Sequence, residues 1–354
     1  MDGQLKKMGF NQGASDPCLY VSLDSEGVTF LVAVYVDDII LGGKSKTRMN
    51  AVKKELSQNF EMKDLGPLHH FLGAKIVQDH VAGVIWIGQP LYTEKMLRKF
   101  DMHDCKPVNT PVNPDVKLVS GESSNDSCNQ QLYQAVVGSL LYLSTKTRPD
   151  IAYAVSSVAR FCASPTKEHW TAVKRILRYL KGTSKLGLLY RDNTSTEITG
   201  YSDADWAGDV GDRKSTSGYA FLLGGAAISW KSNKQTCVAL STAEAEYVAL
   251  SAAAQEAVWL QQLVSDMVNK NIRETTILED NQSAICLAKN QQVHGRTKHI
   301  DIKYHFIRDM VQAGRIKLIY CASEDMVADM FTKGLPIKQF EKLRQMTGIA
   351  ELTR

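Results

Sequence analysis

The order of predicted elements from residue 195 onward constrains the fold more than any other feature. Three apolar strands come first, and they are followed by an Ala-rich helix, a strand, two helices, a strand and a last helix. The second and third strands, 217–225 and 227–232, are joined across a Gly-Gly turn, as in a meander. Strands alternating with helices in this way are typical of an α/β domain.

Acidic residues recur at the ends of these elements. The strand 196–208 carries Asp203 and Asp205, and strand alternation puts both on one face without choosing between them. The strand 274–280 ends at Asp280, directly before a helix. Asp329 is expected about two turns into a terminal helix that begins with Ser323 as its N-cap.

Two acids near the start of the helix 240–264 compete for a role. Glu244 completes an S-x-x-E capping box from Ser241, whereas Glu246 continues the apolar stripe that must face the sheet. A buried acid is costly unless a cation meets it, so Glu246 is the site candidate and Glu244 the cap.

One acid of the first strand, Asp203 or Asp205, is therefore predicted to form a single site with Glu246, Asp280 and Asp329. Each acid alone has an ordinary explanation, as a strand end, a helix cap, a helix-dipole partner or a surface group. Four carboxylates cannot converge as anions without metal, and oxygen-liganded Mg²⁺ or Mn²⁺ suits them. Two such ions would serve the in-line hydrolysis of a phosphodiester.

The N-terminal segment LVAVYVDDIILGG, residues 31–43, is predicted to form a tight hairpin with Asp37 and Asp38 at its tip. These two like charges also favour a metal ion. An amphipathic helix follows over 46–60, then two short strands between residues 64 and 88 and a helix from Tyr92.

The middle of the chain is predicted to be mainly helical. Residues 104–130 are rich in Pro, Asn, Ser and Asp and are expected to form a long loop, helices are expected between 131 and 181, and residues 182–196 are expected to form a second boundary.

The motifs resemble those of one family, in order and over nearly the whole chain. The segments YSDADWAG, STAEAEYVALS, ILEDNQSAICLA and DMVADMFTK resemble the ribonuclease H domain of copia-type retrotransposon Pol polyproteins. Upstream, YVDDIILGG is similar to the polymerase metal motif of reverse transcriptases, LGPLHHFLGAKI to the primer grip, and GSLLYLSTKTRPDIAYAVSSVARF to the thumb-to-connection segment.

The resemblance implies an α/β (α+β overall) architecture in four parts. These are a partial reverse-transcriptase palm (1–90), a mainly helical thumb or connection (91–190), an RNase H-like domain with a five-stranded mixed sheet flanked by helices (195–340), and a C-terminal tail (341–354). The palm is expected to be truncated, because the acids before Tyr35 (Asp2, Asp16, Asp24 and Glu26) stand in loop-like contexts and none replaces the third polymerase Asp.

The activity implied is cleavage of RNA in RNA–DNA hybrids with two Mg²⁺ or Mn²⁺ ions. Asp203 would bridge both ions, Glu246 and Asp329 would complete one shell, and Asp280 would support the other. Asp37 and Asp38 would be the metal ligands of the polymerase remnant. The alternatives are an inactive remnant that binds nucleic acid, and a polymerase subunit that needs the missing upstream part as a partner.

The charge pattern bears on the substrate, since the net charge of +4 is too small to identify a partner. Two basic stretches could follow a phosphate backbone, although a solvated face is the ordinary explanation. Their candidate contacts are Lys174, Arg175, Arg178, Lys181, Arg296, Lys298 and His299.

The compartment is expected to be intracellular, cytoplasmic or nuclear. The sequence has no apolar run long enough for a membrane span, and its start lacks the apolar core of a signal peptide. The seven cysteines form no C-x-x-C pair, so reduced thiols are predicted and a zinc site is not.

Overall fold

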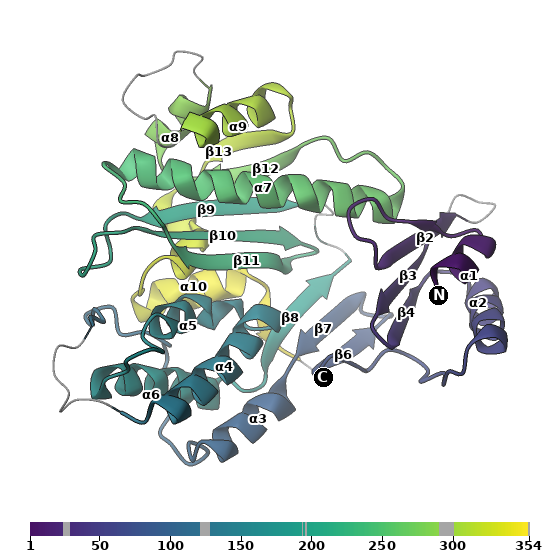
Figure 1. The fold of residues 1–354 in the computed structure, drawn as a ribbon, viewed down its shortest axis with the longest axis horizontal. Coiled ribbons are helices and arrows are strands. Elements are labelled where there is room, and N and C mark those ends of the chain that lie inside the picture. Colours follow the sequence, from purple (N-terminus) through teal and green to yellow (C-terminus); the bar gives the residue numbers. More distant parts are fainter. Residues whose placement is uncertain (24–28, 121–127, 193, 195–196, 290–300, 353–354) are drawn as a thin grey trace. The chain divides into compact units, whose positions relative to one another are not determined.

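The computed structural model describes residues 1–23, 29–120, 128–192, 194, 197–289 and 301–352. It divides into two compact units (Figure 1). The first unit consists of Met1–Leu68 with Gln255–Thr275, and the second of His69–Ala254 with Thr276–Arg354.

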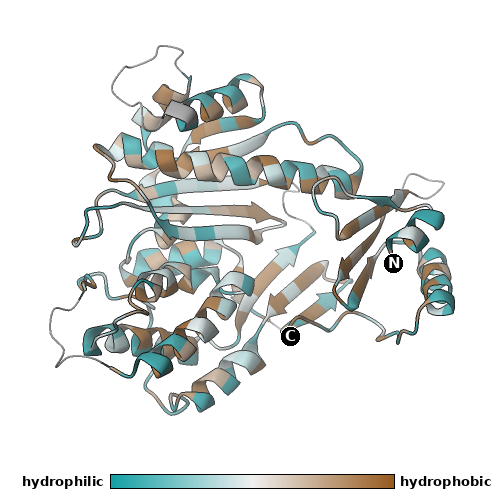
Figure 2. Ribbon diagram, viewed as in Figure 1, coloured by the Kyte–Doolittle hydropathy of each residue, from teal (hydrophilic) through white to brown (hydrophobic). Residues whose placement is uncertain are grey.

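The first unit combines a four-stranded sheet and two helices with the segment Gln255–Thr275, which includes the C-terminal half of the long helix Thr242–Val268. Its strands β1 (Asn11–Gln12), β2 (Leu19–Leu23), β3 (Thr29–Tyr35) and β4 (Asp38–Gly42) lie in sequence order, and its helices are α1 (Asp2–Lys7) and α2 (Lys46–Asn59). The core is made of the buried residues Leu5, Phe10, Tyr20, Phe30, Val32, Val52 and Leu56. In Figure 2 the strands β2, β3 and β4 are largely brown, as a sheet packed on this core requires.

The predicted hairpin and amphipathic helix are both present in this unit. Tyr35 pairs with Asp38, which leaves a two-residue loop in which Val36 has a φ of +53°. Two-residue hairpin loops need such left-handed backbone, and it is unfavourable for a β-branched residue. Ser45 caps α2 by accepting a hydrogen bond from the Arg48 N–H.

The second unit contains a five-stranded sheet that joins residues far apart in the sequence. Its order is β14 (Ile349–Glu351), β8 (Leu186–Arg191), β7 (Val84–Gly88), β6 (Ala74–Asp79) and β5 (His70–Phe71). The expectation of a plain boundary over 182–196 is therefore wrong, because β8 lies within it. The sequence did not predict this strand, because β8 pairs with β7 and β14, which lie far from it along the chain.

Helices make up the middle of the second unit, as the sequence predicted. They are α3 (Pro90–Lys99), α4 (Gln130–Lys146), a short 3₁₀ turn η2 (Pro149–Ile151), α5 (Ala152–Ala159) and α6 (Lys167–Gly182). The described part of 104–129 has neither helix nor strand, which confirms the predicted loop.

A second five-stranded sheet confirms the predicted mixed architecture. Its order is β11 (Ala226–Lys234), β10 (Thr216–Leu223), β9 (Thr199–Asp205), β12 (Thr275–Glu279) and β13 (Ile316–Tyr320). The strand β9 is antiparallel to β10 and parallel to β12. The accompanying helices are α7 (Thr242–Val268), α8 (Gln282–Lys289), α9 (Asp301–Gln312) and α10 (Ile337–Met346).

The predicted terminal helix around Asp329 is not an α-helix. Two 3₁₀ turns, η3 (Ser323–Asp325) and η4 (Val327–Phe331), replace it, and Met326 between them has extended backbone. All five residues of η4 are buried. A regular α-helix would turn some of them to solvent, so packing has overridden the local helical pattern.

None of the helices in the described ranges is long and apolar enough to span a bilayer.

A buried ionic network fixes the helices of the second unit to one another. Arg148 and Asp150 are almost fully buried and form a bidentate pair, with nitrogen–oxygen distances of 2.9 and 2.7 Å. Arg148 also donates to the carbonyl of Thr183, and Tyr179 donates its hydroxyl to Asp150 at 2.6 Å. Arg344 of α10 in turn donates to the Tyr179 hydroxyl.

Replacing Asp150 by Ala should destabilise the protein by about 3–5 kcal/mol, because the buried Arg148 charge would lose its partner. Denaturant unfolding of the variant and the wild type measures this. Glu94→Ala is the control, because it removes only the exposed ion pair with Arg98 and should leave the stability nearly unchanged. Equal losses in the two variants would contradict the structural role of the network.

Candidate metal centre

Five carboxylates from separate parts of the chain lie close together at one edge of the β9–β12 pair. They form two groups, and within each group one oxygen from every acid lies within 4.8 Å of the others. The first group is Asp203, Asp280 and Asp329, and the second is Glu246, Glu279 and Asp280. All four acids predicted from the sequence are thus together, and Glu279 is an addition.

The topology of the sheet explains why the acids of β9 and β12 meet. Parallel neighbours end at the same edge, so Asp203 near the end of β9 lies beside Glu279 and Asp280 at the end of β12. Gly218 of β10 pairs with Asp203. A Cβ at Gly218 would lie 2.7 Å from the Cβ of Phe331, so the absence of a side chain allows η4, which carries Asp329, to lie against the sheet.

Glu244 and Glu246 at the start of α7 have different surroundings, as the helical periodicity predicted. Ser241 accepts a hydrogen bond from the Glu244 N–H, and the Glu244 carboxylate accepts one from the Leu240 N–H. Glu246 joins the second acid group instead. Ala245 and Ala249 of the same helix pack against Ala204 of β9, which holds this face of α7 on the sheet.

The acids divide between the two groups differently from what we expected. Glu246 and Asp329 were expected to share one shell, but they lie in different groups, and Asp280 rather than Asp203 is common to both. Asp205 belongs to neither group and faces Lys117 at 3.9 Å. Ser323, expected as an N-cap, donates a hydrogen bond to the Asp280 carboxylate at 2.7 Å.

Two neighbouring residues missed by sequence reasoning complete the first group. Thr332 donates its hydroxyl to Asp203. The Lys333 ammonium lies 2.7 Å from Asp329 Oδ1 and 3.9 Å from Asp203 Oδ2. The i, i+4 spacing of Asp329 and Lys333 was a visible signal. For Glu279 the signal was a second acid directly before Asp280, at the end of the strand.

Burial and mutual repulsion raise the pKa values of the acids. Desolvation raises the pKa of Asp203 to about 7, with opposition from Lys333 and support from the negative charge of Asp329. Desolvation and the charge of Glu279 raise the pKa of Glu246 to about 11. Burial also raises the pKa of Glu279 well above its ordinary value and raises that of Asp329. Lys333 offsets part of the negative charge at Asp203 and Asp329, whereas no ion pair in the described ranges does so at Glu246 or Glu279.

The residues fit a divalent cation on the chemistry of their donors. Every donor in the two groups is a carboxylate oxygen, the ligand type that Mg²⁺ and Mn²⁺ prefer. Glu246 Oε2 and Glu279 Oε2 are buried and have no hydrogen-bond partner in the described part of the chain. A buried acceptor without a partner is costly, and a cation would satisfy both oxygens.

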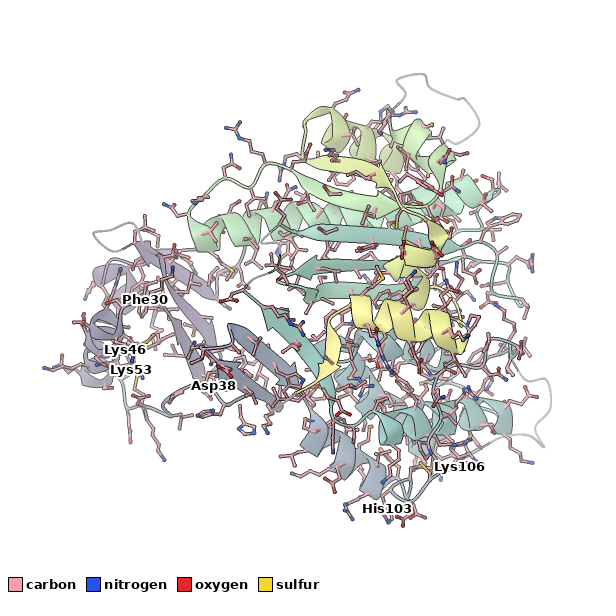
Figure 3. All side chains as sticks on the ribbon, turned by 180° about the vertical axis from the view of Figure 1, so that it is seen from behind. Phe30, Asp38, Lys46, Lys53, His103 and Lys106 are labelled. Carbon is pink, nitrogen blue, oxygen red and sulfur yellow. The ribbon has the colours of Figure 1, made fainter. Side chains whose placement is uncertain are left out.

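Asp37 and Asp38, the predicted polymerase ligands, lie at the exposed tip of the β3–β4 hairpin in the first unit. Figure 3 labels Asp38. Neither belongs to a group of three or more possible ligands in the ranges that the structure covers. Asp2, expected in a loop, begins α1, and Asp24 and Glu26 lie outside the described residues.

The basic residues of α6 divide into two kinds. Arg175 donates to Thr110 at 2.8 Å and Arg178 donates to the carbonyl of Lys106 at 2.7 Å, so both hold the 104–120 loop against the helix. Lys174 and Lys181 are exposed. Arg296, Lys298 and His299 lie outside the described residues.

Comparison with known proteins identifies the family. The chain is 41% identical to the retrovirus-related Pol polyprotein from transposon TNT 1-94 of Nicotiana tabacum, over 98% of this chain and 26% of that protein. It is 38% identical to the Pol polyprotein from transposon RE1 of Arabidopsis thaliana, over 98% of this chain and 23% of that protein. The putative transposon Ty5-1 protein of Saccharomyces cerevisiae is 34% identical, over 72% of this chain and 82% of that protein.

The chain belongs to the copia-type retrotransposon Pol family. Residues 1–114 of this Pol chain match the family described as reverse transcriptase (RNA-dependent DNA polymerase). The chain spans about a quarter of the length of the tobacco and Arabidopsis Pol polyproteins.

Solved structures resemble the fold of this Pol chain. The foamy viral protease-reverse transcriptase in complex with an RNA/DNA hybrid has a TM-score of 0.50 at 14% identity and covers 86% of this chain and 37% of its own. The N-terminal RNase H domain of a Mycobacterium tuberculosis protein covers 43% of this chain and 98% of its own, with a TM-score of 0.30 and 14% identity.

In the metal-free protein, the contribution of Asp203 to stability should fall as the pH rises from about 4 to about 7. The folded state keeps a proton on Asp203 up to about pH 7, whereas the unfolded state releases it near pH 3.8, so the folded state binds more protons in this window. The loss from Asp203 should be on the order of a few kcal/mol. Chemical denaturation at several pH values in a chelator measures it.

The variant Asp203→Asn should show a shallower decrease with pH, because it removes the titrating group. Asp205→Asn, which alters the neighbouring strand-end acid outside both groups, should keep the wild-type slope. An unchanged slope in Asp203→Asn would contradict the assignment of a buried, uncompensated carboxylate to this position.

Proposed function

We propose that the second unit of this Pol chain is a ribonuclease H that cleaves the RNA strand of RNA–DNA hybrids with divalent metal ions. One observation carries the proposal: acids from β9, α7, β12 and η4 converge at a single buried edge, with oxygens that have no partner among the described residues. Such a cluster is costly to the fold unless cations occupy it.

The two acid groups correspond to positions for two ions. Asp203, Asp280 and Asp329 would hold one ion, and Glu246 and Asp280 would contribute to the other. Bound divalent ions supply Lewis acidity, an activated water and charge neutralisation for in-line hydrolysis of a phosphodiester.

The protein's own residues prepare this chemistry. Thr332 and the sheet hold the Asp203 carboxylate in place, and Ser323 does the same for Asp280. Asp203, Glu246 and Asp329 are each at most 6% exposed, so little bulk water screens their charges. Lys333 contributes a positive charge at the same edge, next to where a substrate phosphate would lie.

The hybrid substrate is proposed from the family and from the fold. The foamy viral enzyme of similar fold was solved with an RNA/DNA hybrid. Recognition of a hybrid would rely on groove shape and 2′-hydroxyl contacts rather than on base sequence. Of the predicted phosphate contacts in the described residues, Lys174 and Lys181 are the exposed cations, whereas Arg175 and Arg178 bind the loop.

Asp280→Asn should abolish cleavage of a labelled RNA–DNA hybrid in Mg²⁺ or Mn²⁺, because Asp280 belongs to both acid groups. Circular dichroism and thermal unfolding should show an intact fold. Asp205→Asn is the matched control, since it lies on β9 outside both groups and should keep most of the activity.

Undiminished turnover in Asp280→Asn would refute the proposed centre. Wild-type protein that binds the hybrid but fails to cleave it with either metal would favour the alternative, a nucleic-acid-binding remnant without catalysis. Primer extension by this chain alone would show that Asp37 and Asp38 form a working polymerase site, contrary to the proposal.

Replacing Lys174 and Lys181 together by Ala should weaken hybrid binding and reduce the slope of log affinity against log salt by about 2, because each phosphate contact contributes roughly one unit. Fluorescence anisotropy over a salt series measures this. An equal slope in variant and wild type would place the phosphate contacts elsewhere.

A further inference from the structure

Glu279 is the buried acid that neither the family motif nor the proposed set of four requires. It is the last residue of β12 and is fully buried, in a strand whose other buried residues are Thr275 and Ile277. Its Oε1 accepts a hydrogen bond from the Asn281 N–H at 3.3 Å, whereas its Oε2 has no partner in the described residues.

The orphaned oxygens of Glu279 and Glu246 belong to the same group of acids. Glu246, Glu279 and Asp280 each offer an oxygen within 4.8 Å of the other two. Three carboxylates that converge from a helix and a strand end match the oxygen-rich coordination of a divalent ion.

The two groups differ in the cation that the protein already supplies. The Asp203–Asp280–Asp329 group has the Lys333 ammonium at 2.7 Å from Asp329. No Lys, Arg or His within the described ranges forms an ion pair with Glu246 or Glu279. An external cation is therefore needed most in the group formed by Glu246, Glu279 and Asp280.

We propose that Glu279 is a metal ligand, and that Glu246, Glu279 and Asp280 form a site that binds a divalent cation without nucleic acid. This inference rests on the proposed nuclease function and adds Glu279 to its metal ligands. The other group, partly neutralised by Lys333, would take its ion more weakly until substrate arrives.

The charges support this assignment. When two divalent ions displace the protons, the five ionised carboxylates and the one ammonium carry four net negative charges, which the two ions balance. Without Glu279 the balance would leave an excess of positive charge. The competing explanation is a permanently protonated Glu279 that serves only as a neutral packing group.

The experiment measures Mn²⁺ binding to the full chain without nucleic acid, by calorimetry and by electron paramagnetic resonance. The wild type should bind one ion more tightly than a second. Glu279→Gln should weaken the tighter site by at least tenfold and should reduce the Mn²⁺-induced rise in Tm. Glu244→Gln is the control, since Glu244 is equally buried on α7 but belongs to neither group, and it should bind as the wild type does.

Unchanged Mn²⁺ affinity in Glu279→Gln would overturn the inference, because glutamine mimics the protonated acid. If Glu279→Gln fails to fold, Glu279→Asp replaces it, because this variant keeps the charge but shortens the side chain. Glu279→Asp should still bind Mn²⁺ more weakly than the wild type. Wild-type Mn²⁺ affinity in Glu279→Asp would also overturn the inference. Cleavage assays separate the two proposals. If Glu279→Gln binds Mn²⁺ weakly but still cleaves the hybrid at high Mn²⁺, the metal-ligand proposal and the nuclease proposal are both supported. If the wild type binds Mn²⁺ tightly but does not cleave the hybrid, only the nuclease proposal is refuted.

Discussion

The repulsion and desolvation of five carboxylates at one buried edge is the constraint on which the structure of the second unit depends. Removing anions from water is unfavourable and placing them together is more so, which is why the pKa values of Asp203, Glu246 and Glu279 rise. Packing of the surrounding elements must therefore hold these carboxylates in place. The parallel β9–β12 pair, the side-chain-free Gly218 and the fully buried η4 provide that rigidity.

The protein compensates this charge only in part, and unevenly. Lys333 lies against Asp329, and Thr332 and Ser323 donate hydrogen bonds to Asp203 and Asp280. No Lys, Arg or His of the described residues forms an ion pair with Glu246 or Glu279, and one oxygen of each has no hydrogen-bond partner there. A centre that keeps acids uncompensated at a cost to stability is typical of functional sites, where binding energy repays the cost.

The helical part of the second unit contributes through buried polar contacts of another kind. The Arg148–Asp150–Tyr179 network is fully paired, so it orients helices without leaving charges exposed to an apolar interior. Arg175 and Arg178 use their guanidinium groups to hold the 104–120 loop. Arg175 and Arg178, which the sequence predicted as nucleic-acid contacts, thus have a structural role, whereas Lys174 and Lys181 are exposed.

The sequence by itself determined the α/β order of the second unit, the β3–β4 hairpin and the separation of Glu246 from Glu244, because periodicity, capping and strand ends are local properties. The choice of Asp203 over Asp205 came from the family resemblance, since strand alternation puts both on one face. Only the tertiary structure decided the rest. It placed β8 in a sheet with β14, replaced the helix around Asp329 by 3₁₀ turns, and brought Glu279 and Lys333 into the centre. Strand pairing and burial depend on contacts between residues distant in the chain, and no local pattern encodes which side chains those contacts leave without a partner.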